Sequence, residues 1–362
     1  MEKKLRPIMP ILAEWSTPQL QEKIAVALEG SGAALSTLKL SVTEVEEDIA
    51  LVVNTSGSTG DSKSIAISRA ALIASTNASH KFLGATPGDT WSLLLPTTHI
   101  AGLNVIIRAT ALGTKVLDNR NVDNYQDADF ISIVPTQLHK AVYEDSKLLE
   151  HLTAAEAVLV GGGPLDSNLR KLAESKHVKV VTTYGMTEMS GGCVYNNKPL
   201  EGVKFEVDNN SLIKINGPMM AMGYLSSDGT IKPFEKNGWF ESSDLGEINS
   251  GLLKVIGRAD EVIISGGEKI SLPFVESQIK KIFPDVPLIL FSIPDQLWGE
   301  KLCIGSMKNL SLEEIGSKLG PIYKPKSFFL FDEIPTTIIG KPDRILAKNL
   351  ALKLGTANWI NG

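Results

Sequence analysis

Cysteines and long apolar runs are scarce in this 362-residue chain, and both absences narrow what it can be. Cys193 and Cys303 are too few and too far apart for a disulfide framework, and no Cys-x-x-C pair is present for zinc or redox chemistry. No stretch approaches the roughly 18 apolar residues that cross a bilayer. The basic start, Met1–Arg6, leads into a segment too short and too proline-broken for a secretion signal. We therefore expect reduced thiols and a cytoplasmic location.

The chain also lacks an excess of basic residues. Its 36 Lys and Arg against 41 Asp and Glu give a formal net charge of −5, which argues against a nucleic-acid-binding protein. Glycine (31) and proline (18) are near average use, so the collagen-like and disordered classes are excluded. At about 150 residues per domain, the length predicts two or three domains.

Short apolar runs alternate with helical patterns through the first half of the chain. The helices are predicted at 69–83, with Ser68 as N-cap, and at 164–175. This alternation predicts a layered α/β architecture with a mainly parallel sheet. The candidate strands, rich in β-branched residues, are 49–53, 91–95, 130–134, 157–160 and 178–182.

From about Val203 the pattern changes to short strands separated by turn dipeptides such as Asp228-Gly229 and Ser250-Gly251. It predicts a small β-rich subdomain with hairpins over about 203–257. A further α+β segment follows, with a helix at 272–283 and a buried strand at 288–293. The expected fold is a multi-domain α/β protein with an N-terminal lobe over 1–257 and a small C-terminal lobe over 258–362.

A run of glycines and hydroxyl residues that ends in a lysine follows the strand 49–53. Small residues let backbone N–H groups and hydroxyls approach a phosphate closely, and the lysine adds a compact positive charge. The run therefore predicts a phosphate-binding loop. Its residues are Thr55, Ser56, Gly57, Ser58, Thr59, Gly60 and Lys63.

A Walker A loop is the main alternative for such a run, and two features exclude it. That motif has glycine directly before its lysine, where this chain has Ser62. It also opens a helix, whereas residues 64–68 alternate like a strand. The loop is therefore expected to connect two strands.

A T-S-G-S-T-G loop ending in lysine between two strands resembles the phosphate loop of the adenylate-forming superfamily. Its members are acyl- and aryl-CoA ligases, peptide-synthetase adenylation domains and luciferases. They usually have proline before the lysine, and Ser62 in its place is expected to alter loop mobility rather than chemistry. The resemblance implies a large lobe, shortened here at its N-terminal side, and a small mobile C-terminal lobe.

The run from Tyr184 to Glu188 is similar to the adenine- and phosphate-binding signature of that superfamily. The resemblance implies that Tyr184 stacks on adenine, Thr187 meets the α-phosphate and Glu188, a hard oxygen ligand, helps hold Mg²⁺. It also implies nucleotide contacts for Gly185 and Met186 and for a glycine turn. The turn residues are Gly162, Gly163 and Pro164.

Two later segments match the ribose-binding and hinge sequences of the superfamily. Asp244 ends a Gly-Trp-x-x-Ser-x-Asp run, and its carboxylate is implied to accept hydrogen bonds from both ribose hydroxyls. Arg258 and Asp260 lie in a Gly-Arg-x-Asp sequence. The resemblance implies that the arginine also reaches the ribose and that the aspartate is the pivot between the lobes.

Lys341 stands where the superfamily's Pro-x-x-x-x-Gly-Lys sequence places its catalytic lysine. A positioned ammonium can offset charge on the α-phosphate and the attacking carboxylate as they meet. Gly266 and Gly267 are implied to border the pantetheine channel, where a side chain would block the thiol.

The chain is further similar to the o-succinylbenzoate–CoA ligases, the MenE-type enzymes of menaquinone synthesis, and most of all to their compact actinobacterial forms. Their substrate is a dianion with a flat ring, so Gly191 and Gly192 are expected to lie against that ring and His99 to donate to a carboxylate. Ser190, directly before the glycines, is expected to bind the substrate as well. Arg108, on the opposite helix face from His99, is expected in a structural ion pair. The segments that carry the likeness are 95–102, 159–164, 190–195 and 199–202.

We therefore expect an ATP- and Mg²⁺-dependent ligase that activates o-succinylbenzoate as its acyl-adenylate and transfers it to CoA. The expected catalytic residues are His99, Thr187, Glu188 and Lys341. The partners are small molecules, with neither nucleic acid nor membrane involved, and a homodimer is left open. The alternatives are another acyl- or aryl-CoA ligase, a stand-alone adenylation enzyme that loads a carrier protein, and a non-catalytic nucleotide-binding protein.

Overall fold

Two compact units make up the chain, and the computed structural model describes residues 4–56, 62–234, 237–336 and 342–357. The first unit comprises Met1–Asp208, Lys214–Ser242 and Ile248–Lys254, and the second Asn209–Ile213, Ser243–Glu247 and Val255–Gly362. In these described ranges, every helix falls short of the length and apolar content that a bilayer span requires.

A mainly parallel sheet, as predicted, forms the centre of the first unit. Its strands, in spatial order, are β12 (Lys198–Pro199), β11 (Gly191–Tyr195), β10 (Val180–Met186), β9 (Ala157–Val160), β8 (Phe130–Ile133), β6 (Trp91–Leu93) and β7 (Leu117–Asp118). The strands from β10 to β7 pair in parallel, whereas β11 runs antiparallel to β10.

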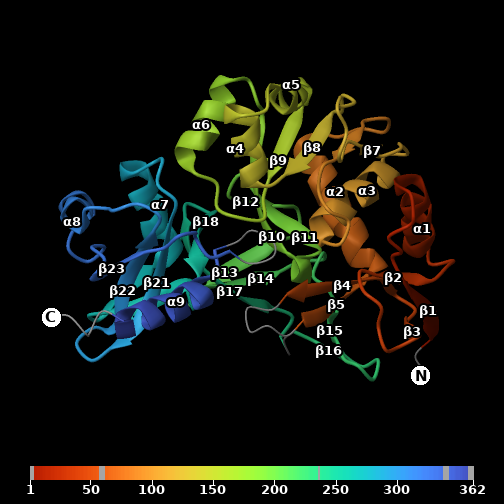
Figure 1. Ribbon diagram of the computed structural model, residues 1–362. Coiled ribbons are helices and arrows are strands. Elements are labelled where there is room, and N and C mark those ends of the chain that lie inside the picture. Colours follow the sequence, from red (N-terminus) through yellow and green to blue (C-terminus); the bar gives the residue numbers. More distant parts are fainter. Residues whose placement is uncertain (1–3, 57–61, 235–236, 337–341, 358–362) are drawn as a thin grey trace. The chain divides into compact units, whose positions relative to one another are not determined.

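Helices cover both faces of this sheet (Figure 1). They are α2 (Arg69–Leu83) and α3 (Ile100–Ala111) on one face, and α4 (Pro135–Tyr143), α5 (Ser146–Ala154) and α6 (Ser167–Ser175) on the other. Because side chains alternate across a strand, Ile131 and Ile133 of β8 share a core with Val158 and Val160 of β9 beneath α4–α6. Burial on both faces explains why these strands read as continuous apolar runs.

A second sheet of the first unit carries the hairpin of the glycine-rich loop. In spatial order its strands are β16 (Ile231–Lys232), β15 (Gly223–Leu225), β5 (Ser62–Ser68), β4 (Ile49–Ser56), β2 (Ala34–Ser36), β1 (Leu5–Pro10) and β3 (Glu44–Glu46). Strands β4 and β5 pair antiparallel with Thr55 opposite Lys63, which confirms the predicted two-strand setting of the loop. Helix α1 (Thr17–Glu29), capped by Ser16, packs against α2 and α3.

The strands after residue 203 divide between two sheets instead of forming one subdomain. Strands β15 and β16 form a hairpin, and Tyr224 of β15 pairs with Ile65 of β5. The other strands form a four-stranded sheet in the order β13 (Lys204–Val207), β14 (Leu212–Asn216), β17 (Phe240–Asn249) and β18 (Leu252–Arg258). Ser250 and Gly251, both with positive φ, make the predicted turn between β17 and β18.

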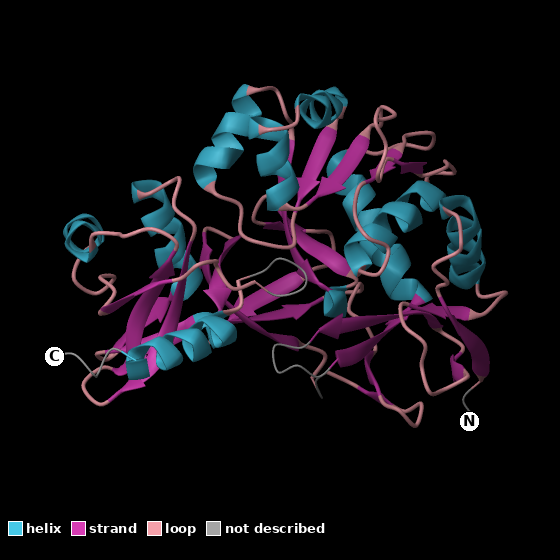
Figure 2. Ribbon diagram, viewed as in Figure 1, coloured by secondary structure: helices cyan, strands magenta, loops and turns pink. Residues whose placement is uncertain are grey.

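The second unit contains a sheet with helices on both faces (Figure 2). Its strands are β20 (Glu268–Ser271), β19 (Val262–Ser265), β22 (Gly299–Ser306) and β21 (Leu288–Asp295), and β23 (Ser327–Leu330) also pairs with β22. Leu288 and Leu290 of β21 share a core with α7 (Leu272–Ile282) and α8 (Leu312–Leu319). Ile289 and Phe291 share the opposite core with α9 (Arg344–Ala357).

Three predicted boundaries can be compared with the hydrogen bonds that set them. Helix α2 spans the predicted residues, with the Ser68 hydroxyl accepting from the Ala71 N–H. Helix α6 begins at Ser167 instead of residue 164, because the Asp166 carboxylate caps its first turn. Strand β10 begins at Val180 instead of residue 178, because the chain is still in the turn that leaves α6.

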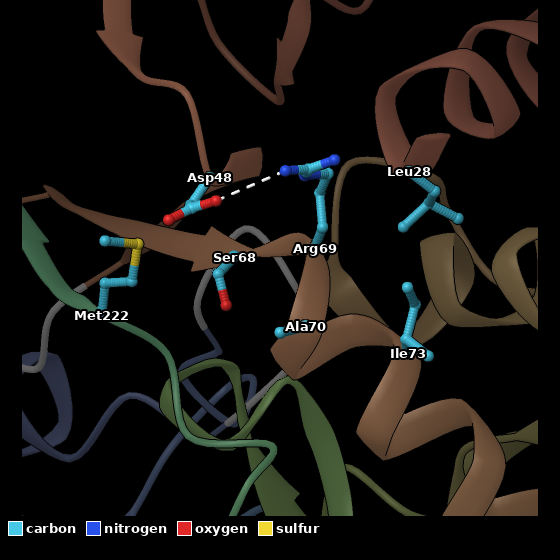
Figure 3. A pocket seen from close by; sticks show the side chains of 7 residues that line it. All are labelled: Leu28, Asp48, Ser68, Arg69, Ala70, Ile73 and Met222. Carbon is cyan, nitrogen blue, oxygen red and sulfur yellow. Dashed lines mark hydrogen bonds and ion pairs between the residues drawn. The ribbon is translucent and has the colours of Figure 1, made fainter. Parts of the chain in front are cut away.

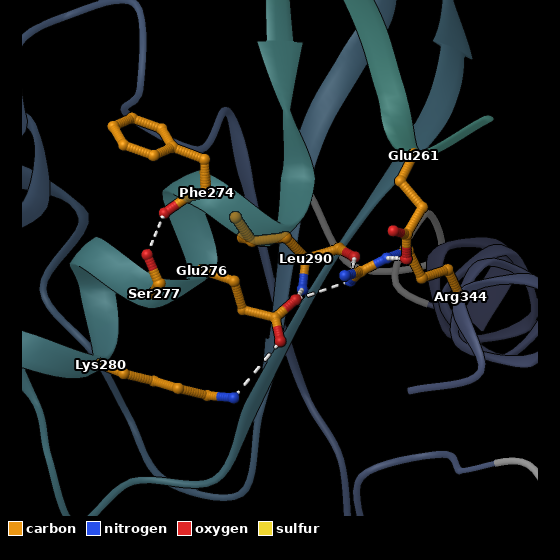
Figure 4. A network of polar contacts seen from close by, with 7 residues as sticks. All are labelled: Glu261, Phe274, Glu276, Ser277, Lys280, Leu290 and Arg344. Atoms are coloured by element: carbon orange, nitrogen blue, oxygen red, sulfur yellow. Dashed lines mark hydrogen bonds and ion pairs between the residues drawn. The ribbon is translucent and has the colours of Figure 1, made fainter. Parts of the chain in front are cut away.

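A buried ion-pair network joins α9 to α7 and β21 in the second unit (Figure 4). Arg344 Nη1 donates to Glu276 Oε2 and to the Leu290 carbonyl, both at 2.6 Å. Glu276 is 5% exposed, accepts from the Leu290 N–H and lies 3.4 Å from Lys280 Nζ. Arg344 Nε lies 3.3 Å from Glu261 of the short helix η2 (Ala259–Glu261). The network fixes the first turn of α9.

We expect Glu276→Ala to lower the free energy of unfolding by about 3–5 kcal/mol, because it leaves the Arg344 guanidinium without its buried carboxylate. Lys280→Ala is the matched control: its ammonium is half exposed, so the loss should stay below about 1 kcal/mol. Urea denaturation of both variants beside the parent protein measures the difference. Equal losses would contradict a dominant role for the buried pair.

Candidate active site

The carboxyl ends of the parallel strands bring several of the predicted ligand-binding residues of the first unit to one edge of the sheet. Strand β6 leads to His99 at the start of α3, and β9 leads to the turn of Gly162, Gly163 and Pro164. Strand β10 itself carries Tyr184 and ends at the short helix η1 (Thr187–Met189). Ligands of open α/β sheets bind beyond the carboxyl ends of the strands, so this edge is the candidate site.

Lys63 is the basic residue in the described part of the glycine-rich hairpin. The Thr55 hydroxyl donates to the Lys63 carbonyl at 3.4 Å, and the Lys63 side chain is exposed, with Nζ 5.2 Å from the ring centre of Tyr224. Tyr224 is a neighbour that the sequence did not single out. Gly57, Ser58, Thr59 and Gly60 lie outside the described residues, as does the side chain of Ser56.

A close backbone approach between β10 and β11 shapes the site. A Cβ on Gly185 would lie 2.0 Å from the Gly191 carbonyl oxygen, and one on Gly192 would lie 2.8 Å from Tyr195 Cε1. Gly191 has a φ of 107°, which side chains rarely allow. The pairing also shifts register between Tyr184 and Gly185. Only glycine at these positions permits the approach.

Helix η1 places two predicted residues directly after β10. Thr187 is buried and Glu188 is half-buried, while Met186 pairs with Gly191 at the end of the strand. The Ala221 N–H donates to the Glu188 carbonyl at 2.8 Å. This bond ties the turn to the segment that leads into β15.

Ser190 is fully buried beneath the glycines. Its backbone is left-handed (φ 54°), and its hydroxyl donates to the Met219 carbonyl at 2.7 Å. Its own carbonyl accepts from the Asn104 side-chain amide at 2.8 Å. These bonds give Ser190 the role of holding the turn that presents Gly191.

A polar network of Tyr195, Arg108, Ser79 and Trp91 supports Gly192. Tyr195 Oη lies 2.9 Å from Arg108 Nη2 and 3.0 Å from Ser79 Oγ. The buried Arg108 guanidinium lies 5.0 Å from the ring centre of Trp91. The predicted ion pair of Arg108 is wrong, because its described partners are a phenol and the face of an indole ring.

Cys193 follows these glycines on β11 and is fully buried. Its thiol lies 3.7 Å from the Tyr184 carbonyl oxygen, to which it can donate. Burial raises the pKa of this thiol to about 12, so it stays protonated at neutral pH.

His99 is the residue directly before α3, in the segment that follows β6. Its side chain is exposed and does not cap the helix. Gly102, one turn on, lets the helix start pack closely, since a Cβ there would lie 2.2 Å from the Pro96 carbonyl oxygen.

The ribose-binding and hinge positions belong to the second unit. Arg258 Nη1 lies 3.9 Å from Asp244 Oδ1, and the Asp244 side chain is 18% exposed. Asp260 lies in η2, with its side chain outside the described part. Lys341 lies outside the described residues, three positions before α9 begins.

Gly266 and Gly267 form the turn between β19 and β20, where Ser265 pairs with Glu268. Both glycines have positive φ (60° and 87°), a conformation they adopt without strain. A Cβ on Gly266 would lie 3.0 Å from the ring of Trp298, while one on Gly267 would meet open space.

A hollow of about 470 Å³ lies elsewhere in the first unit (Figure 3). It adjoins Ser68 at the end of β5, whereas the phosphate-loop lysine Lys63 lies near the start of that strand. Arg69 and Asp48 form an ion pair of 3.3 Å at its rim. The hollow is therefore separate from the candidate site. Its lining residues are Leu28, Asp48, Ser68, Arg69, Ala70, Ile73 and Met222.

Phosphate is the ligand that best suits the hairpin and this edge, because together they supply a lysine, hydroxyl groups and close-packed glycines. The fold and the site thus define a nucleotide-binding α/β enzyme. The chain belongs to the AMP-binding enzyme family, whose model matches residues 6–225.

Curated relatives match over most of the chain. The Mycobacterium tuberculosis (strain H37Rv) protein named "Probable 2-succinylbenzoate--CoA ligase" is 33% identical over 329 residues, covering 83% of this chain and 84% of the relative. The 2-succinylbenzoate--CoA ligase of Lactococcus lactis is 29% identical over 343 residues, covering 86% of this chain and 73% of the relative.

Solved structures share the fold and confirm the predicted α/β class. The Bacillus subtilis o-succinylbenzoate CoA synthetase (MenE), in complex with the acyl-adenylate intermediate OSB-AMP, has a TM-score of 0.73 at 24% identity, over 94% of this chain and 83% of that one. Escherichia coli MenE with a bound analogue of OSB-AMS has a TM-score of 0.71 at 20% identity, over 96% and 82%.

We expect acid to destabilise the protein through His80, which lies beside Trp91 and Arg108 in the core. Burial, and next the charge of Arg108, lower the pKa of His80 from 6.5 to about 4. Between these values the unfolded chain binds more protons than the folded one, so the free energy of unfolding falls as pH drops, by an amount on the order of 3 kcal/mol.

Urea denaturation from pH 7 to 4 should show this loss, and His80→Gln should flatten the profile. The flattening will be partial, because burial also lowers the pKa of His151 and acts in the same direction. Parallel profiles for parent and variant would contradict the assignment to His80.

Proposed function

We propose that the chain is a 2-succinylbenzoate–CoA ligase. The substrate carboxylate attacks the α-phosphorus of ATP to form the acyl-adenylate and release diphosphate, and the CoA thiol then attacks the acyl carbon and releases AMP. The observation that carries this substrate is the 33% identity, over 83% of this chain, to the protein of that name.

In the first half-reaction, Lys63 and the hairpin before it would bind the terminal phosphates. Tyr184 would stack on the adenine, and Thr187 would donate to the α-phosphate from the start of η1. This division fits the positions of the residues: Lys63 is exposed on the hairpin, and Thr187 and Glu188 lie three and four residues after Tyr184, at the end of β10.

Glu188 would hold Mg²⁺ together with the nucleotide. In the described ranges, no group of three or more His, Cys, Asp or Glu side chains could hold a metal by itself. A lone carboxylate fits, because Mg²⁺ keeps several waters and binds mainly through substrate phosphates. When bound, Mg²⁺ supplies positive charge at the phosphates.

The remaining nucleotide and substrate contacts follow from the positions above. Asp244 and Arg258, 3.9 Å apart, would bind the ribose. Gly191 and Gly192 would lie against the aromatic ring of the acid, and the exposed His99 would donate to a carboxylate.

The second half-reaction would use the lobe from 258 to 362, which turns about Asp260 relative to the lobe from 1 to 257. The turn of Gly266 and Gly267 would then border the channel for the CoA thiol, since at least Gly267 faces open space. The ligase would act in the cytoplasm, with ATP, Mg²⁺ and CoA as its small-molecule partners.

A screen of carboxylic acids with ATP and CoA tests the substrate. We expect o-succinylbenzoate to give the largest thioester yield, followed by mass, and the largest acid-dependent release of diphosphate. A higher yield with benzoate or a fatty acid would assign another acyl-CoA ligase. Turnover only with a carrier protein would assign a stand-alone adenylation enzyme.

We expect Lys341→Ala to reduce adenylation at least 100-fold and to leave the dissociation constant of ATP nearly unchanged, because a positioned cation acts mainly on the developing charge. Lys348→Ala, on α9, is the control and should keep parental activity. Diphosphate release and equilibrium ATP binding measure the two effects. A fully active Lys341→Ala protein would contradict this role.

A further inference from the structure

Tyr224 faces the lysine of the phosphate-binding hairpin across two neighbouring strands. It pairs with Ile65 of β5, and Lys63 is two residues from Ile65, so Lys63 and Tyr224 are diagonal neighbours on one face of the sheet. The Lys63 ammonium lies 5.2 Å from the ring centre, within cation–π range.

The backbone and an aromatic neighbour, itself packed on a second ring, hold the Tyr224 ring in place. A Cβ on Gly223 would lie 2.2 Å from the Lys232 carbonyl oxygen, so the two strands of this hairpin can approach only at a glycine. Phe234 meets Tyr224 edge to face at 4.9 Å and contacts Phe240 at 5.1 Å. The ring is thus part of a packed cluster and does not depend on Lys63 for its position.

The same ring lies in the electrostatic field of the proposed magnesium ligand. Ala221 lies three residues before Tyr224, and its N–H donates a hydrogen bond to the Glu188 carbonyl. Burial, and next the negative charge of Glu188, raise the pKa of the Tyr224 hydroxyl, which therefore stays protonated at neutral pH. Strand β5, which carries Lys63, contacts η1, which carries Glu188, so Lys63, Tyr224 and Glu188 lie in one region of the first unit.

We propose that Tyr224 is a positioning residue of the nucleotide site, whose ring face holds the Lys63 ammonium ready for the diphosphate end of ATP. This rests on the proposed use of Lys63 as a phosphate ligand.

A ring face suits this task better than a carboxylate would. It attracts the ammonium through its quadrupole and leaves the positive charge unneutralised, so the charge remains available to phosphate. It also limits the freedom of a long side chain, whose ordering otherwise costs rotamer entropy on binding. Phosphate can therefore bind the Lys63 ammonium without displacing the Tyr224 ring, whereas it would have to compete with a carboxylate.

Equilibrium binding of MgATP to Tyr224→Leu and Tyr224→Phe tests the ring. We expect Tyr224→Leu to raise the dissociation constant about three- to tenfold, because the ring face is lost. Tyr224→Phe keeps the ring and should stay within about twofold of the parent. An unchanged constant in Tyr224→Leu, or equal losses in both variants, would overturn the proposal.

A double-mutant cycle with Lys63→Met separates positioning from packing. If the ring acts through Lys63, then Tyr224→Leu should weaken MgATP binding in the parent but not in the Lys63→Met background. Effects that simply multiply would show that the ring acts through the fold alone and would overturn the proposal.

Phe240→Leu is the control for the aromatic cluster, since Phe240 is buried against Phe234. It should lower the thermal midpoint at least as much as Tyr224→Leu does, with ATP affinity within about twofold of the parent. A matching loss of ATP affinity in Phe240→Leu would overturn the proposal. MgATP binding is measured without acid or CoA, so a failure of the proposed ligase activity would be seen separately, in thioester formation.

Discussion

The close approach of β10 and β11 is the constraint on which the candidate site depends. A side chain at Gly185 would collide with the Gly191 carbonyl oxygen, so the two strands can meet there only without Cβ atoms. The contact lies where Tyr184 and Thr187 reach the edge of the sheet, and Ser190, directly before Gly191, has a left-handed backbone. These glycines have no side chains of their own to pack, and the buried Tyr195–Arg108 hydrogen bond lies next to Gly192.

Local signals made much of the architecture predictable. Strands β6, β8, β9 and β10 of the central sheet, helix α2 with its Ser68 cap and the two-strand setting of the glycine-rich loop all follow from periodicity and turn chemistry within a few residues. Tyr184 and Glu188 come instead from the family resemblance, and the structure places the first on β10 and the second in η1, which follows that strand.

Contacts between distant segments could not be read in this way. Tyr224 meets Lys63 only because β15 joins the sheet of β5, a pairing between segments far apart in the sequence. The helix-face argument correctly separated Arg108 from His99, but no sequence pattern identifies a phenol and an indole as the partners of a buried guanidinium. The burial of Ser190 likewise depends on the distant Met219 carbonyl.

The residues before the loop form a cover for the hairpin sheet. Strand β2 pairs with β4, and β1 extends the sheet outward to β3. Arg6 on β1 is buried and donates to the carbonyls of Ala27, Gly32 and Ile49. These bonds link β1 to α1 and to β4. A short segment thus pairs the backbone edge of β4, and the edge of the sheet moves outward to β3.

The buried thiol of Cys193 has a consequence for a site that would form a mixed anhydride. Of the two forms of a cysteine, only the thiolate attacks such an activated acyl group efficiently, and burial keeps Cys193, one residue beyond Gly192, in its unreactive protonated form. Burial raises the pKa of the other thiol, Cys303, to about 11. An activated acid held against β11 would therefore meet no protein thiolate of this chain. Acylation of the protein's own thiols would be suppressed, and the acyl group would be kept for a thiol that arrives from solution.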